Sequence, residues 1–204
     1  MSPDPRPFFA SAARWFSDLV TRVPATAWDQ PGLGEWDLRA LIGHTSRSLI
    51  TVDTYLDRPA VQVSVATPWD YYRAASELAA ASPDAVVERG RQAGAALGDH
   101  PAQTIADLVE RVLGRVAATD DPVIETIVGG MRFSEYLPTR TFELVVHGYD
   151  IAAALDLDPP PLDVDTLASA LDLAGRIAIA AGSGDAVLRA LTGRTELPTC
   201  FTVV

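Results

Sequence analysis

Apolar residues recur every three or four positions in one segment of this chain after another, and no other feature of the sequence constrains the fold as strongly. The first such stripe comprises Phe8, Phe9, Ala12, Trp15, Phe16, Leu19 and Val23. A period of 3.6 residues places these side chains on one face of a helix, and that face has to be buried against other helices. Many of the apolar residues are alanine, which is a strong helix former. The chain is therefore predicted to be all-α.

Proline, serine and aspartate predict where the helices begin and end. Asp37 is expected to cap the helix that follows it, and Ser82-Pro83 is expected to end one helix and start the next. Pro138 is expected either to kink its helix or to mark the first turn. On these signals the predicted helices span residues 7–23, 36–56, 68–81, 83–97, 102–118, 132–155, 164–181 and 185–191.

Three segments lack helical spacing and are expected to be extended. They are residues 61–65, residues 123–128, which Gly129-Gly130 closes, and the end of the tail, residues 192–204. The last of these contains Cys200, the only cysteine, which is expected to be buried in a terminal strand. A single cysteine excludes an internal disulfide and a cysteine-based metal site.

The clearest break in the chain is the acidic and proline-rich run over residues 156–161. A chain of 204 residues is long enough for one domain with an extension. We therefore expect one unit over residues 1–155 and a C-terminal extension over residues 156–204 that packs on it.

The charge and hydropathy of the chain exclude several classes of partner. Sixteen arginines, no lysine and 27 acidic residues give a formal net charge of −11. An acidic surface repels phosphate backbones and anionic lipids, so neither nucleic acid nor a membrane is an expected partner. No apolar run reaches the roughly 18 residues that a membrane span needs. The N-terminal residues lack a basic segment followed by an apolar core, so we expect no secretory signal and a cytoplasmic protein.

Three residues that are far apart in the sequence offer a specific chemistry. Glu143 and His147 are four positions apart in a predicted helix, so they share one face of that helix, one turn apart. His44 lies in an earlier predicted helix, at the border of its apolar face. If the two helices face each other across a bundle, two imidazoles and one carboxylate converge. These are the ligands of a catalytic zinc with an open fourth position.

Other interpretations of these residues stay open on the sequence alone. Glu143 and His147 could be a partly exposed polar pair, although the apolar neighbours leave little solvated face. His44 alone is more often a core or boundary histidine than a ligand, and His100, before a proline in a predicted loop, is expected to be exposed. The spacing differs from the His-Glu-x-x-His motif of metalloproteases, in which both histidines lie on one helix, so no protease is predicted.

Two neighbours of the set are candidate catalytic residues. Asp150 follows His147 by three positions and is placed to accept the free ring N–H, which would fix the tautomer of the imidazole. Arg140 precedes Glu143 by one turn and would orient that carboxylate or bind an anionic substrate. The alternative for both residues is an ordinary charge on a helix surface.

The residues around these positions resemble a known family. Residues 34–44, Gly-Glu-Trp-Asp-Leu-Arg-Ala-Leu-Ile-Gly-His, and residues 140–150, Arg-Thr-Phe-Glu-Leu-Val-Val-His-Gly-Tyr-Asp, are similar to the two signatures of the mycothiol-dependent maleylpyruvate isomerase family. That family belongs to the DinB-like metalloenzymes. The resemblance runs from the first predicted helix to about Leu155. It implies a DinB-like four-helix bundle over residues 1–155 and a short helical and strand extension after it.

The resemblance also implies a function. Zinc, or another divalent metal, would be held by His44, Glu143 and His147, and the open position would bind the thiol of mycothiol. The thiolate would add to a small electrophile, as in maleylpyruvate-type cis–trans isomerisation, or displace a leaving group from it. The expected partners are therefore a low-molecular-weight thiol and a small electrophilic substrate, and the chain is expected to be a monomer or a homodimer.

Two alternatives from other classes stay open. One is a non-catalytic small-molecule-binding or stress-response module that keeps the bundle, and the other is a metal-free structural protein. Metal content distinguishes the second alternative from the enzyme, and mycothiol-dependent turnover distinguishes the first.

Overall fold

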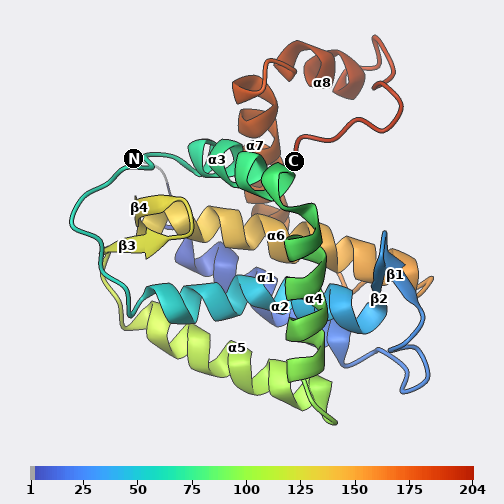
Figure 1. Cartoon of the computed structure of the whole chain (residues 1–204). Coiled ribbons are helices and arrows are strands. Elements are labelled where there is room, and N and C mark those ends of the chain that lie inside the picture. Colours follow the sequence, from blue (N-terminus) through green and yellow to red (C-terminus); the bar gives the residue numbers. More distant parts are fainter. Residues whose placement is uncertain (1–2) are drawn as a thin grey trace.

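The computed structural model describes residues 3–204, which form eight helices and two short antiparallel sheets (Figure 1). The predicted all-α class is confirmed. In chain order the elements are α1 (Arg6–Val20), β1 (Pro31–Leu33), β2 (Trp36–Asp37), α2 (Leu38–Tyr55), α3 (Pro68–Ala81), α4 (Pro83–Ala96), α5 (Pro101–Ala117), β3 (Val123–Thr126), β4 (Gly129–Arg132), α6 (Phe133–Ala154), α7 (Val164–Ala180) and α8 (Gly184–Leu191).

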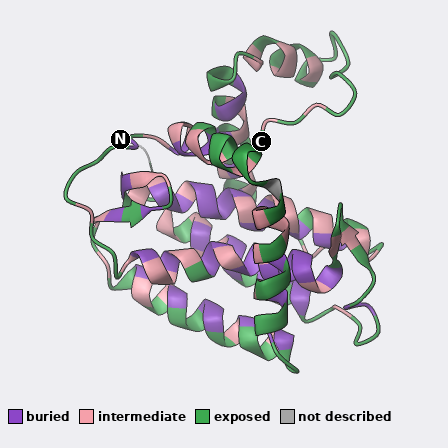
Figure 2. Ribbon diagram, viewed as in Figure 1, coloured by how far each residue is buried: buried purple, intermediate pink, exposed green. Residues whose placement is uncertain are grey.

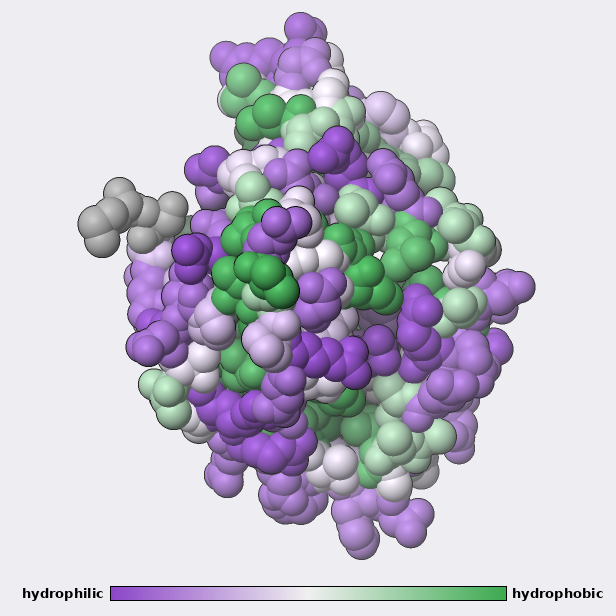
Figure 3. Space-filling model, turned by 60° about the vertical axis from the view of Figure 1, so that its left-hand side comes forward, coloured by the Kyte–Doolittle hydropathy of each residue, from purple (hydrophilic) through white to green (hydrophobic). Residues whose placement is uncertain are grey.

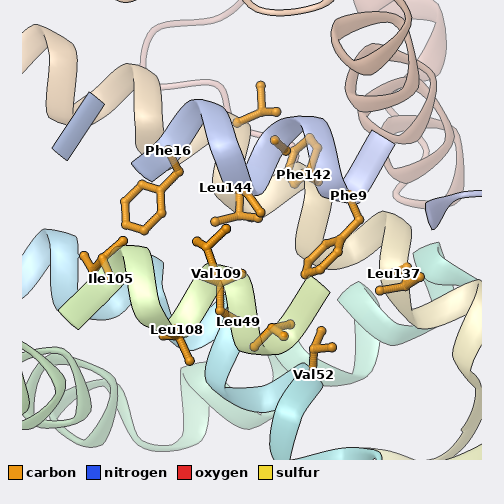
Figure 4. Close-up of a cluster of buried hydrophobic side chains, with 14 of the residues drawn as sticks. Phe9, Phe16, Leu49, Val52, Ile105, Leu108, Val109, Leu137, Phe142 and Leu144 are labelled. Carbon is orange, nitrogen blue, oxygen red and sulfur yellow. The ribbon is translucent and has the colours of Figure 1, made fainter. Parts of the chain in front are cut away.

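Helices α1, α2, α5 and α6 pack side by side as a four-helix bundle. The predicted apolar stripe of the first helix faces inward, and Phe9 and Phe16 are fully buried. They meet Leu49 of α2, Val109 of α5 and Leu144 of α6 in one continuous core (Figure 4). Burial of large apolar side chains is the main favourable contribution to folding, so the packing of these four helices supplies much of the stability of the molecule. Figure 2 shows the buried residues concentrated on them.

Helices α2 and α6 run antiparallel. At one end His44 lies beside His147, with the two ring centroids 5.0 Å apart. Further along α2, Thr51 Oγ1 accepts a hydrogen bond of 2.8 Å from the hydroxyl of Tyr136. A later position in α2 therefore faces an earlier position in α6. Consequently, residues that follow His44 and residues that precede His147 lie in the same direction along the bundle.

Side-chain caps explain the starts of α2, α3 and α7, and in α7 Asp163 accepts from the backbone N–H of Thr166. Asp37 accepts a hydrogen bond of 2.7 Å from the backbone N–H of Ala40, as predicted. Thr67 caps α3 in the same way, and Pro68 is its first residue, so α3 has the bounds that its sequence predicts. Ser82 stands at the N-cap position of α4 but makes no side-chain capping bond.

The extended segments match the predictions only in part. Residues 123–126 form β3 of a hairpin with β4, as expected for the region that Gly129 closes. Residues 61–65 do not form a strand, although the backbone N–H groups of Ser64 and Val65 both donate to the carbonyl of Gly130. Residues 31–37, which lie between the first two predicted helices and at the start of the second, form the small β1–β2 hairpin.

The C-terminal part differs from its prediction at the tail. Helix α7 packs against α1, α3 and α6, and α8 packs against α7. Within the described chain, residues 192–204 form no strand, and Cys200 is exposed rather than buried, so both expectations were wrong. A strand needs a hydrogen-bonding partner, and no other strand lies beside this tail. The boundary at residue 155 stays a prediction.

The surface of α7 and α8 carries several exposed apolar side chains. Figure 3 shows hydrophobic residues among hydrophilic ones at this projecting end of the molecule, where Leu188 and Leu191 are exposed. None of the described helices is long and apolar enough to cross a bilayer.

Candidate metal centre

The structure brings together the three predicted metal ligands. One ligand atom each of His44, Glu143 and His147 can be chosen so that all three lie within 4.8 Å of one another. His44 comes from α2, and the other two come from successive turns of α6. The rings of His44 and His147 meet edge-on, with an interplanar angle of 84°.

Each histidine stands next to a glycine at which two helices touch. A Cβ atom on Gly43 would lie 2.1 Å from the backbone nitrogen of Gly94, so α2 and α4 cross with backbone against backbone. A Cβ atom on Gly148 would lie 2.1 Å from the ring of Trp15, which brings α1 close to α6. These close approaches fix the positions of the helices that carry His44 and His147.

Both oxygens of Glu143 have a close polar partner. Oε2 lies 3.3 Å from Nε2 of His147, and Oε1 accepts a hydrogen bond of 2.7 Å from the hydroxyl of Tyr72. The same hydroxyl lies 3.1 Å from the carbonyl oxygen of Thr139. Tyr72 comes from α3, so a third helix sets the orientation of the carboxylate.

Asp150 lies where the sequence predicts a partner for His147. Its Oδ2 is 2.9 Å from Nδ1 of His147, on the side of the ring away from Glu143. With Nδ1 held by Asp150, Nε2 of His147 faces Glu143, so the lone pair that Nε2 has once it is deprotonated points toward the other two ligands. This is the arrangement that metal-binding histidines commonly have.

The imidazole of His44 is packed against an aromatic ring and lacks one hydrogen bond. The ring of Trp36 lies over it, with centroids 4.4 Å apart. Trp36 is itself anchored, because its Nε1 donates to the carbonyl of Val87 at 3.0 Å. Among the described residues, Nδ1 of His44 is the one fully buried side-chain nitrogen or oxygen without a hydrogen-bond partner.

The electrostatics of the centre keep two of the three candidate ligands, His44 and Glu143, in the deprotonated form that binds a metal. Burial and the neighbouring His147 lower the pKa of His44 to about 4, so this imidazole is neutral at pH 7. Burial opposes the ionisation of Glu143, but its hydrogen bond with His147 and the charge of Arg140 hold the pKa of the carboxyl below its ordinary value. Burial also opposes a charge on His147, yet the hydrogen bonds with Asp150 and Glu143 raise the pKa of that imidazole. A proton on Nε2 of His147 would therefore compete with a metal for the same lone pair.

The geometry also fits a divalent ion. Two ligands bound at about 2.1 Å with a tetrahedral angle between them are about 3.4 Å apart, and Nε2 of His147 lies 3.3 Å from Oε2 of Glu143. The side chains of His147 and Glu143 keep 16% and 20% of their surface exposed, so a further ligand could reach the centre from solvent. Two imidazoles, one carboxylate and an open fourth position make up a catalytic zinc site, and His147 has to lose its Nε2 proton to act as a ligand there.

The other predicted residues fall into two groups. Arg140 is buried one turn before Glu143, and Asp150 contacts His147, so both candidate catalytic residues lie at the centre. His100 stands at the N-cap position of α5 and is exposed, as predicted, and it is not part of the cluster. Pro138 is the sixth residue of α6, so it does not mark the first turn of that helix.

Two residues at the centre were not predicted from the sequence. Tyr72 lies within the predicted helix of residues 68–81 without a role of its own, and Trp36 belongs to the family signature of residues 34–44 without a predicted contact to the site. A weak signal for Tyr72 existed, since the adjacent aromatics Tyr71 and Tyr72 open an otherwise alanine-rich helix. Their approach to Glu143 depends on how α3 packs against α6, which no local pattern encodes.

Comparison with known proteins agrees with the resemblance of the two signatures. Residues 9–152 match the family model described as the mycothiol maleylpyruvate isomerase N-terminal domain. The chain belongs to this family. The matched region contains the metal-ligand candidates as well as Arg140 and Asp150, and it ends within α6, before α7 and α8. Searches of curated proteins and of solved structures found no match.

Proposed function

We propose that this protein is a metal-dependent enzyme that uses mycothiol, or a similar small thiol, as the nucleophile toward a small electrophile. The reaction would be an addition that isomerises the substrate or a substitution that leaves the thiol attached. The observation that carries the proposal is the convergence of His44 from α2 with Glu143 and His147 from α6 at a position that solvent reaches. Family membership supports the thiol and the isomerase chemistry.

In this proposal His44, Glu143 and His147 hold zinc or another divalent ion. A divalent ion bound here would stabilise a thiol as its thiolate, which is the reactive form. The centre itself offers ligands and no protein nucleophile, and Cys200, the only cysteine of the chain, lies in the tail after α8. A thiol cofactor would therefore supply the nucleophile that the side chains of the centre lack.

The surrounding residues have separate tasks. Asp150 holds the proton on Nδ1 of His147, which keeps Nε2 available as a ligand. Tyr72 donates to one oxygen of Glu143 and leaves the other directed at His147. Trp36 covers one face of His44 and shields that ring from water.

Metal analysis of the purified protein tests the centre. Wild type reconstituted with zinc should retain about one ion per chain, the number that one set of three ligands binds, and His147→Ala should lose it. His100→Ala is the matched control, because this histidine is exposed and outside the cluster, and it should retain the ion. Wild type that retains no zinc after reconstitution, or His147→Ala that retains as much as wild type, would refute the centre.

Turnover tests the chemistry separately. The zinc-loaded protein should isomerise maleylpyruvate, or conjugate another small electrophile, only when mycothiol is present, and His44→Ala should be inactive. Zinc binding without any thiol-dependent turnover across a panel of electrophiles would favour the non-catalytic binding module. Full activity of His44→Ala would rule out the proposed role of the three ligands.

A further inference from the structure

Helix α8 has an apolar side, yet none of its eight residues is buried. Leu188 and Leu191 are 64% and 79% exposed, and the helix packs against α7 at the end of the molecule that projects from the bundle (Figure 1). A helix this short is marginal in water on its own, and in proteins most of its stability comes from burying an apolar face. The exposed side of α8 therefore points to a partner that covers it.

Helix α7 continues this apolar surface. Leu171 and Ile179 are 61% and 69% exposed, and Gly175 lies between them, so the three positions follow one another by single turns on one face. A Cβ atom on Gly175 would have no neighbouring atom within 4 Å, so the space beside this glycine is open. Gly175, Ile179, Leu188 and Leu191 line a groove of about 560 Å³ between the two helices. A leucine side chain of another molecule can enter this groove beside the glycine.

The four exposed side chains Leu171, Ile179, Leu188 and Leu191 form what we call the α7–α8 patch. The charges beside this patch are balanced. Asp172 pairs with Arg176 on α7 at 2.8 Å, and α8 carries one acid and one arginine. Two molecules with a formal net charge of −11 each repel one another, and this repulsion is weakest where the local charges cancel. The patch is therefore a surface at which two copies of this acidic chain can approach.

The two charges of α8 are complementary to those of a second α8. Asp185 and Arg189 are exposed, and neither forms an ion pair within residues 3–204. If two α8 helices pack antiparallel about a two-fold axis, Asp185 of each copy faces Arg189 of the other. A two-fold axis makes every such contact occur twice, so one helix supplies both halves of two ion pairs. A second copy of the chain satisfies these charges without any other protein.

We propose that the α7–α8 patch is the interface of a homodimer, in which α8 of each copy covers the patch of the other. The leucines of α8 enter the groove beside Gly175 of the second copy, and two ion pairs between Asp185 and Arg189 border the apolar contact. Because four apolar side chains per copy make a small interface, the dimer is weak and forms at micromolar concentrations. The patch lies on α7 and α8, after the ligands of the metal centre, and the proposal does not rest on the proposed function.

Sedimentation velocity of the full-length protein, over concentrations from about 1 to 100 µM, tests the interface. Wild type should shift from one chain per particle to two over this range. Leu188→Glu should weaken the dimer by about 100-fold or more, because each copy would bury an unpaired charge. Ile127→Glu is the matched control, since it places the same charge at an exposed apolar position between β3 and β4, and it should dimerise as wild type does.

Charge reversal tests the pairing of the two helices. Asp185→Arg and Arg189→Asp should each weaken self-association by about tenfold, because like charges then face each other at two places. An equimolar mixture of the two variants should dimerise as readily as wild type, since one variant offers two cations where the other offers two anions. A change in helix stability within one chain cannot produce this rescue by mixing.

Thermal unfolding of each variant establishes that it is folded. Wild type that stays monomeric at about 100 µM would overturn the interface, and so would Leu188→Glu that dimerises as wild type does. A mixture of the charge-reversed variants that is no more dimeric than either variant alone would overturn the antiparallel pairing. Binding of monomeric wild type to phosphatidylcholine vesicles, with loss of binding in Leu188→Glu, would show that lipid covers the patch in place of a second copy.

Discussion

The crossing of α2 and α4 at Gly43 gives a sharp test of the packing that positions His44. An alanine there would place its Cβ 2.1 Å from the nitrogen and 2.4 Å from the Cα of Gly94, and 2.7 Å from the carbonyl carbon of Ala93. All three atoms belong to the backbone, so no side-chain rotation relieves the clash. The two helices would have to move apart.

The expected loss follows from two opposing effects. Excess volume in a packed core typically costs about 1–3 kcal/mol, and a contact with backbone atoms belongs at the upper end of this range. Replacing glycine by alanine inside a helix stabilises the helix by about 1 kcal/mol, because alanine has the higher helix propensity. Gly43→Ala should therefore lower the free energy of unfolding by about 2 kcal/mol.

Gly114→Ala is the matched control. Gly114 also lies inside a helix, α5, but no atom lies within 4 Å of the position of its Cβ. This substitution should raise stability by up to about 1 kcal/mol. Urea unfolding of both metal-free variants, followed by circular dichroism, measures the difference. The packing argument fails if Gly43→Ala proves as stable as Gly114→Ala.

Two further predictions concern the charges of the centre. The folded-state pKa of His44, about 4, lies below the ordinary value of 6.5, so the metal-free protein should lose stability as the pH falls through this window. The loss of unfolding free energy should reach at most about 3 kcal/mol. Urea titrations between pH 6.5 and 4.5 should show this fall in stability with pH for wild type and not for His44→Gln. Equal pH dependence of the two proteins would contradict the lowered pKa. Asp150→Ala should weaken zinc binding about 10- to 100-fold in a chelator competition, whereas Asp107→Ala on the exposed side of α5 should not, and equal affinities would remove Asp150 from the centre.

Much of the fold could be predicted because its signals are local. Asp37 caps the start of α2, and the apolar spacing of α1 determines which face is buried. The tail was predicted wrongly because its residues have strand-forming side chains, and strand formation depends on a partner strand that is absent beside residues 192–204 of the described chain. Propensity alone cannot supply that partner.

The residues of the candidate metal centre also fall into those that local sequence predicts and those that depend on tertiary packing. The shared face of Glu143 and His147 follows from helical spacing, and it needs no knowledge of tertiary structure. The contact of Tyr72 with Glu143 joins residues 71 positions apart, and the contact of Trp36 with His44 depends on a hairpin that the loop sequence did not predict. Such residues become visible only once the packing of α3 and of the β1–β2 hairpin against the bundle is known.

If the centre binds a metal ion as proposed, the positions of His44 and His147 in the chain have a consequence for the lifetime of the protein. The two residues meet in space although 147 − 44 = 103 positions separate them in the sequence. A covalent cross-link across a loop of about a hundred residues stabilises a folded chain by about 4–5 kcal/mol. An ion bound by both histidines would also link the two ends of this loop and stabilise the folded chain. Metal starvation would then leave more of the chain unfolded and open to proteases. The supply of the ion would thus govern how much of this protein persists in the cell.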